Sequence, residues 1–263
     1  MDLNLKGKSV VVTGGGTGIG EAAALEFARE GAQVSICGRR LDRLQEMARR
    51  AADQGLTIRY YQVDVTDTVA LEAMAEQIVQ EVGGIDVWVN NAGIAINRPV
   101  LEFTEEEYRK VVAINMDAVF FGSQIAARHM IRQGRGGVIL NAESYAVKIP
   151  HAQGAVYAAT KAAVQSFVRS FAANLAPYGI RVIGYIPGMI VSEISEESIR
   201  ENRKLYTQNI AMQRLGRPED LAKTLVFLAS DGAGYISGTD VEIAGGKYAV
   251  QDSEFPWKQA GLL

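Results

Sequence analysis

The sequence predicts an open, doubly wound α/β fold, in which helices cover both faces of one parallel sheet. Short runs rich in β-branched residues alternate with longer stretches of helical spacing, and several of the short runs are apolar throughout. Strands that are apolar on both faces are typical of parallel sheets, because crossover helices cover each face. No low-complexity tract or Pro/Ser-rich linker interrupts the alternation. We therefore expect a single domain over residues 1–263.

The expected strands and helices alternate along the whole chain. The expected strands are Ser9–Thr13, Gln33–Cys37, Thr57–Val63, Val87–Val89, Gly137–Asn141, Arg181–Tyr185 and Asp240–Ile243. The expected helices are Gly20–Glu30, Arg43–Gln54, Val69–Glu81, Thr104–Arg132, Val156–Ala176 and Pro218–Ser230. Thr104 with Glu107 three residues later predicts a capping box at the start of the fourth helix.

Composition excludes several classes of protein. Apolar residues make up 48% of the chain and 27 Gly accompany only 6 Pro, which excludes a disordered or collagen-like chain. Lys and Arg number 27 against 30 Asp and Glu, so the net charge of −3 offers no basic excess to a nucleic-acid backbone. We expect no nucleic-acid partner.

Membrane and metal partners are not expected either. Charged residues precede any apolar run at the N-terminus, and no apolar segment approaches the roughly 20 residues that cross a bilayer. Cys37 is the only cysteine, and the two histidines form no metal-ligand pattern. These features predict a cytoplasmic, reduced protein without a metal site.

A glycine-rich turn, Thr13–Gly20 (TGGGTGIG), joins the first expected strand to the first expected helix. Glycines let the backbone approach a pyrophosphate, and the helix N-terminus offers free N–H groups and a positive dipole end. A tight connection without a ligand is the alternative, but the turn lies in the first βα unit of the series, which favours a dinucleotide. The expected contacts are Gly14, Gly16, Thr17, Gly18 and Ile19.

The end of the second expected strand bears on the choice of dinucleotide. An acidic residue there would hydrogen-bond a free ribose 2′-hydroxyl, whereas an arginine suits a 2′-phosphate. Gly38 is followed by Arg39 and Arg40, with no carboxylate at the strand end. NADP(H) is therefore favoured and NAD(H) stays possible. Two solvated arginines at a helix start are the alternative, since Thr17 adds no further basic side chain.

A tyrosine and a lysine lie four residues apart in the expected helix Val156–Ala176. On a helix, Tyr157 and Lys161 leave the same face and can reach one ligand. Such a pair alone is usually structural. Ser144, however, follows the expected strand Gly137–Asn141, at the edge where doubly wound sheets bind ligands. The three residues together predict an active site.

With these motifs, the chain resembles the short-chain dehydrogenase/reductase family from Leu5 to Gly246. The resemblance rests on the glycine turn, Asp64, Asn90–Gly93 (NNAG), Asn115, Ser144, the Tyr157/Lys161 pair and Pro187-Gly188, all in the family's order. It implies a catalytic tetrad of Asn115, Ser144, Tyr157 and Lys161. It also implies cofactor contacts from Asp64, Val65, Asn91, Ala92, Gly93, Tyr157, Lys161, Pro187, Gly188, Ile190 and Ser192.

The resemblance implies a mechanism in which Tyr157 is the acid/base and Ser144 holds the substrate oxygen. Lys161 reaches the nicotinamide ribose, and Asn115 anchors a water. A free tyrosine titrates near 10, and we expect the Lys161 ammonium and an oxidised nicotinamide to lower the pKa of Tyr157. The expected substrate contacts are Ser144, Tyr145, His151, Gln153, Tyr157 and Met189.

Three functions are consistent with these residues. The first is an NADP(H)-dependent carbonyl reductase or alcohol dehydrogenase acting on a small molecule. The second is a reductase of conjugated enoyl or dienoyl thioesters, whose glycine turn is similar. The third is a nucleotide-binding sensor, which would not need Tyr157 and Lys161 together. Departures from the family pattern at Ile183, at Gly184-Tyr185 and at Glu143, where the family often has Ser, leave the substrate unassigned.

Two segments are expected to act outside the sheet. The polar stretch 188–214 follows a strand at the binding edge and predicts a mobile substrate lid. The tail 247–263 carries Phe255 and Trp257 and is apolar enough to pack on a neighbouring subunit. The helices expected over Thr104–Arg132 and Val156–Ala176 are apolar on more than one side, which indicates a homo-oligomer. The resemblance implies a dimer or tetramer.

Overall fold

A seven-stranded sheet with the order β3-β2-β1-β4-β5-β6-β7 forms the centre of the computed structural model, which describes residues 3–191, 199, 206–207 and 209–262. Neighbouring strands pair in parallel throughout. The prediction of an open, doubly wound α/β fold is confirmed. The strands are β1 Ser9–Thr13, β2 Gln33–Gly38, β3 Ile58–Gln62, β4 Val87–Asn90, β5 Gly137–Ala142, β6 Ile180–Pro187 and β7 Asp240–Ile243.

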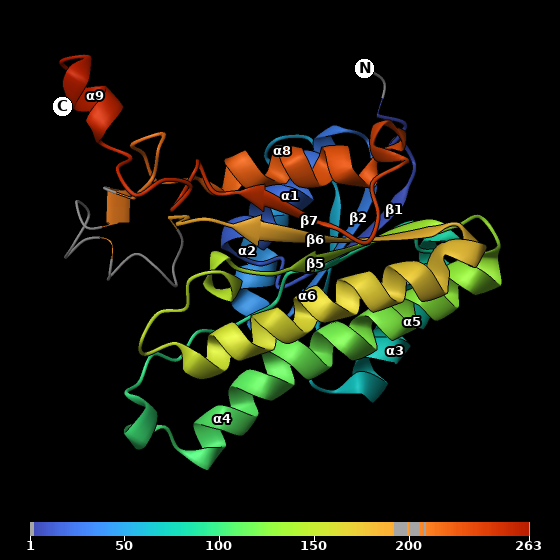
Figure 1. Ribbon diagram of the computed structural model, residues 1–263. Coiled ribbons are helices and arrows are strands. Elements are labelled where there is room, and N and C mark those ends of the chain that lie inside the picture. The colour runs from blue at the N-terminus through green and yellow to red at the C-terminus, as the bar shows by residue number, and fades with distance from the viewer. Residues whose placement is uncertain (1–2, 192–198, 200–205, 208, 263) are drawn as a thin grey trace.

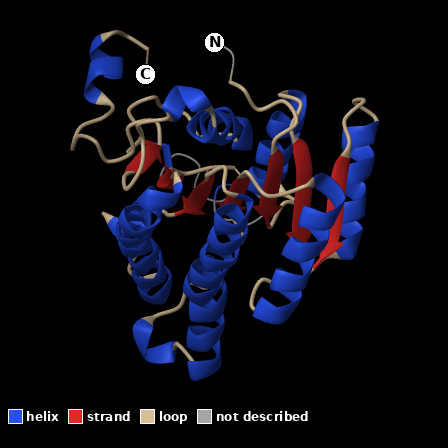
Figure 2. Cartoon of the chain, turned by 90° about the vertical axis from the view of Figure 1, so that its right-hand side faces the viewer, coloured by secondary structure: helices blue, strands red, loops and turns tan. Residues whose placement is uncertain are grey.

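Helices cover both faces of this sheet (Figures 1 and 2). The described α-helices are α1 Gly18–Arg29, α2 Leu41–Ala52, α3 Thr68–Val82, α4 Glu105–Val112, α5 Ala118–Gln133, α6 Ala155–Leu175, α8 Pro218–Ala229 and α9 Phe255–Gln259. Shorter turns are η1 Val100–Glu102, the π-helical η2 Ala113–Asp117, η3 Tyr145–Val147, η4 Ala176–Tyr178 and η5 Asp231–Ala233. In Figure 1, α1 and α8 lie above the sheet, and α3, α5 and α6 lie below it.

Two hydrophobic cores lie on opposite faces of the sheet. Val10 and Val12 of β1 pack with Phe27 of α1 and Leu225 of α8 in one core. Val11, between them in sequence, belongs to the other core, which α3, α5 and α6 complete. Successive strand side chains point to opposite faces. Burial of both faces therefore explains why the strands are apolar throughout.

The strand order reverses between β1 and β4. The chain moves outward from β1 to β2 and β3 and then returns to β4 on the other side of β1. At such a reversal, the connections after the two central strands leave in opposite directions and open a crevice at their carboxyl ends. The fold thus provides a binding crevice after β1 and β4.

The fourth predicted helix is interrupted in its middle. Its capping box is confirmed: Glu107 N–H donates to Thr104 Oγ1 at 3.1 Å, and Thr104 N–H donates to the Glu107 carboxylate at 3.2 Å. Between α4 and α5, however, Ala118 N–H donates to Ala113 O, five residues back, which makes η2 a π-helical turn. Hydrophobic periodicity does not reveal one extra residue in a turn, so the sequence predicts a continuous helix here.

Several negative expectations can be compared with the described part of the chain. There, no helix is long and apolar enough to cross a bilayer, and no group of three His, Cys, Asp or Glu side chains could hold a metal ion. Cys37 is buried in the second core, and burial raises the pKa of its thiol to about 12. Cys37 therefore packs as a small apolar residue.

The C-terminal tail extends away from the two helical layers, and Figure 1 shows α9 standing apart from the sheet. One contact that holds it is the hydrogen bond from Trp257 Nε1 to Ala211 O, at 2.9 Å. Phe255, two residues earlier, is 58% exposed. The tail thus keeps an apolar side chain in solvent beside an anchored tryptophan.

Candidate active site

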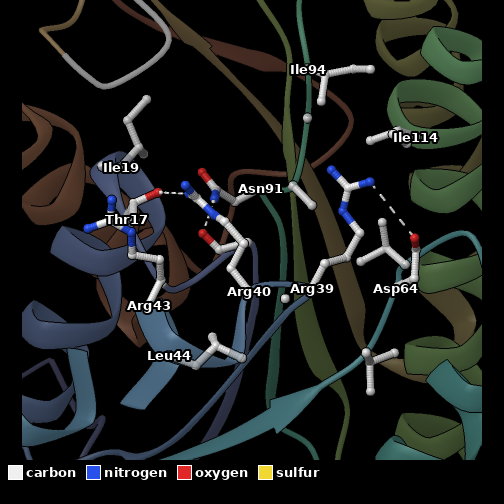
Figure 3. Close-up of a pocket in the computed structure, with 18 residues that line it drawn as sticks. Thr17, Ile19, Arg39, Arg40, Arg43, Leu44, Asp64, Asn91, Ile94 and Ile114 are labelled. Carbon is white, nitrogen blue, oxygen red and sulfur yellow. Dashed lines mark hydrogen bonds and ion pairs between the residues drawn. The ribbon is translucent and has the colours of Figure 1, made fainter. Parts of the chain in front are cut away.

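A cavity of about 430 Å³ opens where β1, β2 and β4 end (Figure 3). All the cofactor contacts predicted between Gly14 and Gly93 line it: Gly14, Gly16, Thr17, Gly18, Ile19, Arg39, Arg40, Asp64, Val65, Asn91, Ala92 and Gly93. Six lining residues were outside the predicted cofactor contacts: Gly38, Arg43, Leu44, Val63, Ile94 and Ile114. The crevice expected from the strand order is therefore the cavity that these motifs line.

The turn after β1 requires glycine because its backbone passes close to the loop after β4. Gly14 has φ +66°, and a Cβ there would lie 2.9 Å from Ala92 Cα. Thr13 Oγ1 accepts hydrogen bonds from Asn91 N at 3.0 Å and Ala92 N at 3.1 Å, which ties the end of β1 to the end of β4. A low turn that leads into the N-terminus of α1 fits a diphosphate.

Three arginines gather near the end of β2 (Figure 3). Arg40 Nη2 donates to Thr17 Oγ1 at 3.3 Å, and Arg39 Nη1 lies 4.0 Å from Asp64 Oδ2. Arg43, one helical turn after Arg40, brings the third guanidinium. Its i+3 spacing from Arg40 at a helix start is a signal that the sequence does contain. Together they suit a doubly charged phosphate.

The predicted tetrad comes from three parts of the chain and lies together: Asn115, Ser144, Tyr157 and Lys161. Lys161 Nζ donates to Ala142 O at 2.8 Å and lies 5.9 Å from the centre of the Tyr157 ring. Ser144 Oγ accepts from Ala146 N at 3.2 Å and is hydrogen-bonded to Tyr157. A Cβ on Gly93 would lie 3.3 Å from Asn115 Oδ1 and 3.7 Å from Lys161 Nζ. Gly93, which lines the cavity, therefore connects it to the tetrad.

Asn115 is held by the loop after β4. Ile94 N–H donates to its Oδ1 at 2.9 Å, and its Nδ2 donates to Ile94 O at 2.8 Å. The side chain is fully buried, in the π-helical turn η2. The amide thus closes this loop against η2, and its contact with a water stays a prediction.

Burial acts on the ionisable members of the tetrad. It raises the pKa of Tyr157, and the hydrogen bond with Ser144 opposes that rise. In the chain by itself, burial is the larger of these two causes, so the pKa of Tyr157 is raised. The expected lowering by Lys161 together with an oxidised nicotinamide stays a prediction. Burial also lowers the pKa of Lys161 to about 8, and the nearby Glu143 opposes this fall once it is ionised.

The predicted substrate contacts lie in different surroundings. Tyr145 directly follows Ser144 and is half-buried. His151 and Gln153 are exposed in the loop before α6, where Gln153 N donates to His151 Nδ1 at 3.3 Å. Nothing in this geometry turns either side chain toward the tetrad. Tyr145 is thus the member of this group that lies beside the Ser144 and Tyr157 hydroxyls.

Lys247 was outside the prediction and lies against Tyr145. Its Nζ lies 4.9 Å from the centre of the Tyr145 ring and 4.7 Å from that of Tyr248. Lys247 is 5% exposed, and burial lowers its pKa. Tyr248 has φ +56°, a conformation uncommon for a bulky residue. A strained tyrosine thus helps to enclose a buried ammonium, a feature that no local pattern in the sequence indicates.

The predicted contacts after β6 line a second, smaller cavity of about 100 Å³: Gly188, Met189 and Ile190. Gly188 N–H donates to Ile243 O at 3.0 Å, and a Cβ at 188 would lie 2.6 Å from Ala244 Cα. Pro187 is the last residue of β6. Ser192 and most of the predicted lid, residues 192–198, 200–205 and 208, lie outside the described residues.

A doubly wound sheet with a glycine turn at its strand-order reversal defines a dinucleotide-binding protein. The model of the short chain dehydrogenase family matches residues 8–203. The chain belongs to the short-chain dehydrogenase/reductase family, which confirms the resemblance and makes it an NAD(P)-dependent oxidoreductase.

Two curated relatives and one solved structure are similar over nearly the whole chain. The L-rhamnose 1-dehydrogenase (NAD(P)(+)) of Azotobacter vinelandii is 38% identical over 92% of this chain and 96% of its own. The 3-oxoacyl-acyl-carrier-protein reductase of Thermotoga maritima is 34% identical over 93% and 99%. A short-chain type dehydrogenase/reductase from Mycobacterium marinum superposes with a TM-score of 0.90 at 38% identity, over 94% and 98%. The two named relatives act on different substrates, so similarity assigns none.

Proposed function

We propose that the chain transfers a hydride between NADP(H) and the carbonyl or secondary alcohol carbon of a small molecule, with Tyr157 as acid/base. One observation carries this proposal: the Ser144–Tyr157–Lys161 cluster lies beside the cavity that the three arginines line. When bound, the nicotinamide supplies or accepts the hydride. The residues of the chain bind it and handle the proton.

Cofactor binding divides between backbone and side chains. The glycine turn and the N-terminus of α1 would hold the diphosphate. Asp64 and Val65 line the cavity on the adenine side, and Arg39, Arg40 and Arg43 would hold a ribose 2′-phosphate. NAD(H) is the alternative, but the end of β2 offers its free 2′-hydroxyl no carboxylate at Gly38.

The proton is handled by two hydroxyl groups. In reduction, Tyr157 donates its proton to the substrate oxygen while the Ser144 hydroxyl hydrogen-bonds the same atom; in oxidation, Tyr157 takes the proton back. Because burial raises the pKa of Tyr157, its hydroxyl keeps the proton at neutral pH. The chain by itself is thus prepared as a proton donor. Lys161, buried beside the ring, would also bind the nicotinamide ribose.

Lys247 supports a narrower substrate class, one that carries a carboxylate or phosphate. Its ammonium contacts two ring faces, and no carboxylate of the described chain pairs with it. A lysine that is 5% exposed and pairs with no carboxylate of the described chain is better stabilised when an anion binds it. Lys247 contacts Tyr145, which directly follows Ser144. A substrate whose reacting carbon lies at Ser144 could therefore place an anionic group near Lys247.

A substrate screen tests the proposal. NADPH oxidation is followed with ketones, sugars, steroids, 3-oxoacyl thioesters and enoyl thioesters, and we expect turnover of a carbonyl compound. Turnover of enoyl thioesters alone would favour the second candidate, a reductase of conjugated thioesters. Tight NADPH binding without turnover of any compound would favour a sensor.

Cofactor preference is tested on the same substrate. We expect a higher kcat/KM with NADPH than with NADH, and a reversed preference in the Gly38→Asp/Arg39→Leu variant. The variant should lose charge pairing with the 2′-phosphate and gain a ribose hydrogen bond. A wild type that already prefers NADH would overturn the assignment.

We also propose a cytoplasmic homo-oligomer, a dimer or tetramer. Phe120 of α5 packs with Phe167 and Phe171 of α6, and Phe121 beside it is 41% exposed. An aromatic cluster that reaches the surface of two neighbouring helices suits an interface between copies. Light scattering at micromolar concentration should give a multiple of the chain mass, and Phe121→Glu should lower it. A monomer in the wild type would contradict this.

A further inference from the structure

Glu143, directly before Ser144, is a buried carboxyl group that the proposed mechanism does not use. It is 2% exposed and lies at the end of β5, where its N–H donates to Tyr185 O at 2.9 Å. Its two carboxyl oxygens and Oδ1 of Asp240 have no hydrogen-bond donor within reach. Ionised carboxylates only accept hydrogen bonds. If both groups were ionised, three buried oxygens would lack a partner.

The two carboxyl groups meet above Gly184. On β6, Gly184 pairs with Asp240 of β7, and a Cβ at position 184 would overlap the Glu143 carboxyl and lie 2.9 Å from Asp240 Oδ1. The absence of a side chain at 184 therefore makes the space in which they approach each other. Glu143 and Gly184, both departures from the family pattern, form one packed unit with Asp240.

Neighbouring charges determine which carboxyl group carries a proton. Asp240 Oδ2 accepts from Arg169 Nη2 at 2.6 Å and from Gln165 Nε2 at 3.0 Å, both on α6. Asp240 is thus the carboxyl group of the two that is bound by a cation. Lys161, also on α6, favours the charged form of Glu143, but burial disfavours that form more strongly. The other charged groups of β7 and η3 nearby, Glu242 and Lys148, pair with each other.

We propose that Glu143 is a positioning residue of this active site, which as a neutral acid donates a hydrogen bond from its O–H to Asp240 above Gly184 and so fixes the backbone that leads into Ser144. Burial and the adjacent Asp240 carboxylate raise the pKa of Glu143 to about 8, so it keeps the proton at neutral pH. One proton between the two groups satisfies an oxygen on each.

This bond lies within the active-site segment. Ala142 O accepts a hydrogen bond from Lys161 Nζ, and Ser144 carries the hydroxyl that is hydrogen-bonded to Tyr157. Glu143, which bonds to Asp240, lies between these two residues. Ionisation of Glu143 would place two buried negative charges side by side, which is strongly unfavourable. The consequence for turnover rests on the proposed function, whereas the consequence for stability does not.

A pH comparison with Glu143→Gln tests the shared proton. Glutamine keeps the shape and a hydrogen-bond donor but cannot ionise. A carboxyl whose pKa is raised by folding contributes stability that is present at low pH and is lost as pH rises through the raised value, here about 8. We expect the melting temperature of the wild type to fall by about 5 °C or more relative to Glu143→Gln between pH 6 and pH 9.

Turnover gives the second readout of the same pair. With each pH profile normalised to its own maximum, the alkaline loss of kcat should begin about one pH unit lower in the wild type than in Glu143→Gln. In Glu143→Gln the Lys161 pKa can only fall, because Glu143 raises it in the wild type. That change would move the alkaline loss of the variant to lower pH, so a later loss in the variant reports Glu143. Parallel melting curves would overturn the proposal. A melting difference without a kcat difference would confine Glu143 to stability and overturn its positioning role.

A packing exchange tests the geometry without substrate or cofactor. Gly184→Ala in the wild type places a methyl group where the Glu143 carboxyl lies, so we expect a large loss of melting temperature or of soluble protein. In the Glu143→Ser background the same change should be tolerated, because the space is open. Equal losses in the two backgrounds would overturn the inference even if the protein proves to be an active reductase.

Discussion

The carboxyl edge of the sheet is built in two different ways at its two ends. After β1 and β4 the site is mostly backbone: a glycine turn, a helix N-terminus, and arginines that remain about half exposed. After β5 and β7 it is mostly buried ionisable side chains, among them Glu143, Lys161 and Lys247. We call these the cofactor end and the substrate end.

The difference shows where the molecule buries charged side chains at a cost in stability. Backbone N–H groups and exposed guanidinium groups need no desolvated charge to hold a phosphate. Buried charges reduce stability unless they are paired, and they concentrate at sites where chemistry needs shifted pKa values. The cofactor end should therefore tolerate changes in pH, and the substrate end should respond to them.

The largest expected effect separates chemistry from cofactor binding. Tyr157→Phe removes the transferable proton and keeps the ring, so turnover should fall by about 10²–10⁴. NADPH affinity, measured by fluorescence titration, should stay near the wild-type value. Retained turnover would remove Tyr157 from its role. A parallel loss of affinity would show that the two ends are not separable.

The next effect belongs to the cofactor end. Arg40→Leu with Arg43→Leu should weaken NADPH binding by about 10–100-fold, since a hydrogen bond to a charged group contributes about 1.5–3 kcal/mol. NADH binding should change little, because it lacks the 2′-phosphate. Arg109→Leu, on the exposed face of α4, is the matched control. Equal losses of affinity for NADPH and NADH would show that Arg40 and Arg43 do not bind the 2′-phosphate.

A smaller effect is expected at the substrate end. Lys247→Met keeps the length of the side chain and removes its charge, so KM for a carboxylate substrate should rise about 10-fold, whereas KM for its methyl ester should not. Lys110→Met on α4 is the control, since Lys110 is exposed. A rise for acid and ester alike would indicate lost packing between Tyr145 and Tyr248 instead.

The smallest effect lies outside both ends. Thr104→Ala removes the side-chain cap of α4 and should lower the free energy of unfolding by about 1 kcal/mol. Denaturant titration measures the loss, and turnover per folded molecule should be unchanged. A change in KM would mean that α4 transmits its position to the substrate end.

The cofactor end could be predicted from the sequence because it is local. The turn around Gly14 lies within one βα unit, and its glycine spacing alone indicates that it binds a diphosphate. Glu143, Gly184 and Asp240 lie far apart in the sequence and become one unit only when β5, β6 and β7 pair. Local patterns do not report such adjacency. Burial raises the pKa of Tyr157 in the chain by itself. The sequence does not indicate this for a related reason, since the extent of burial follows from tertiary packing.

The π-helical turn η2 has a consequence for how this chain can change its length. It contains one more residue than an α-helical turn, so deletion of a single residue there would restore a regular helix without breaking the chain. Because η2 takes up the extra residue locally, that deletion would leave the faces that α4 and α5 present unchanged. Substitution of Asn115 would remove the side-chain amide that is hydrogen-bonded to Ile94. Deletion of a residue next to Asn115 would keep that amide in the sequence but tighten the turn that holds it against Ile94.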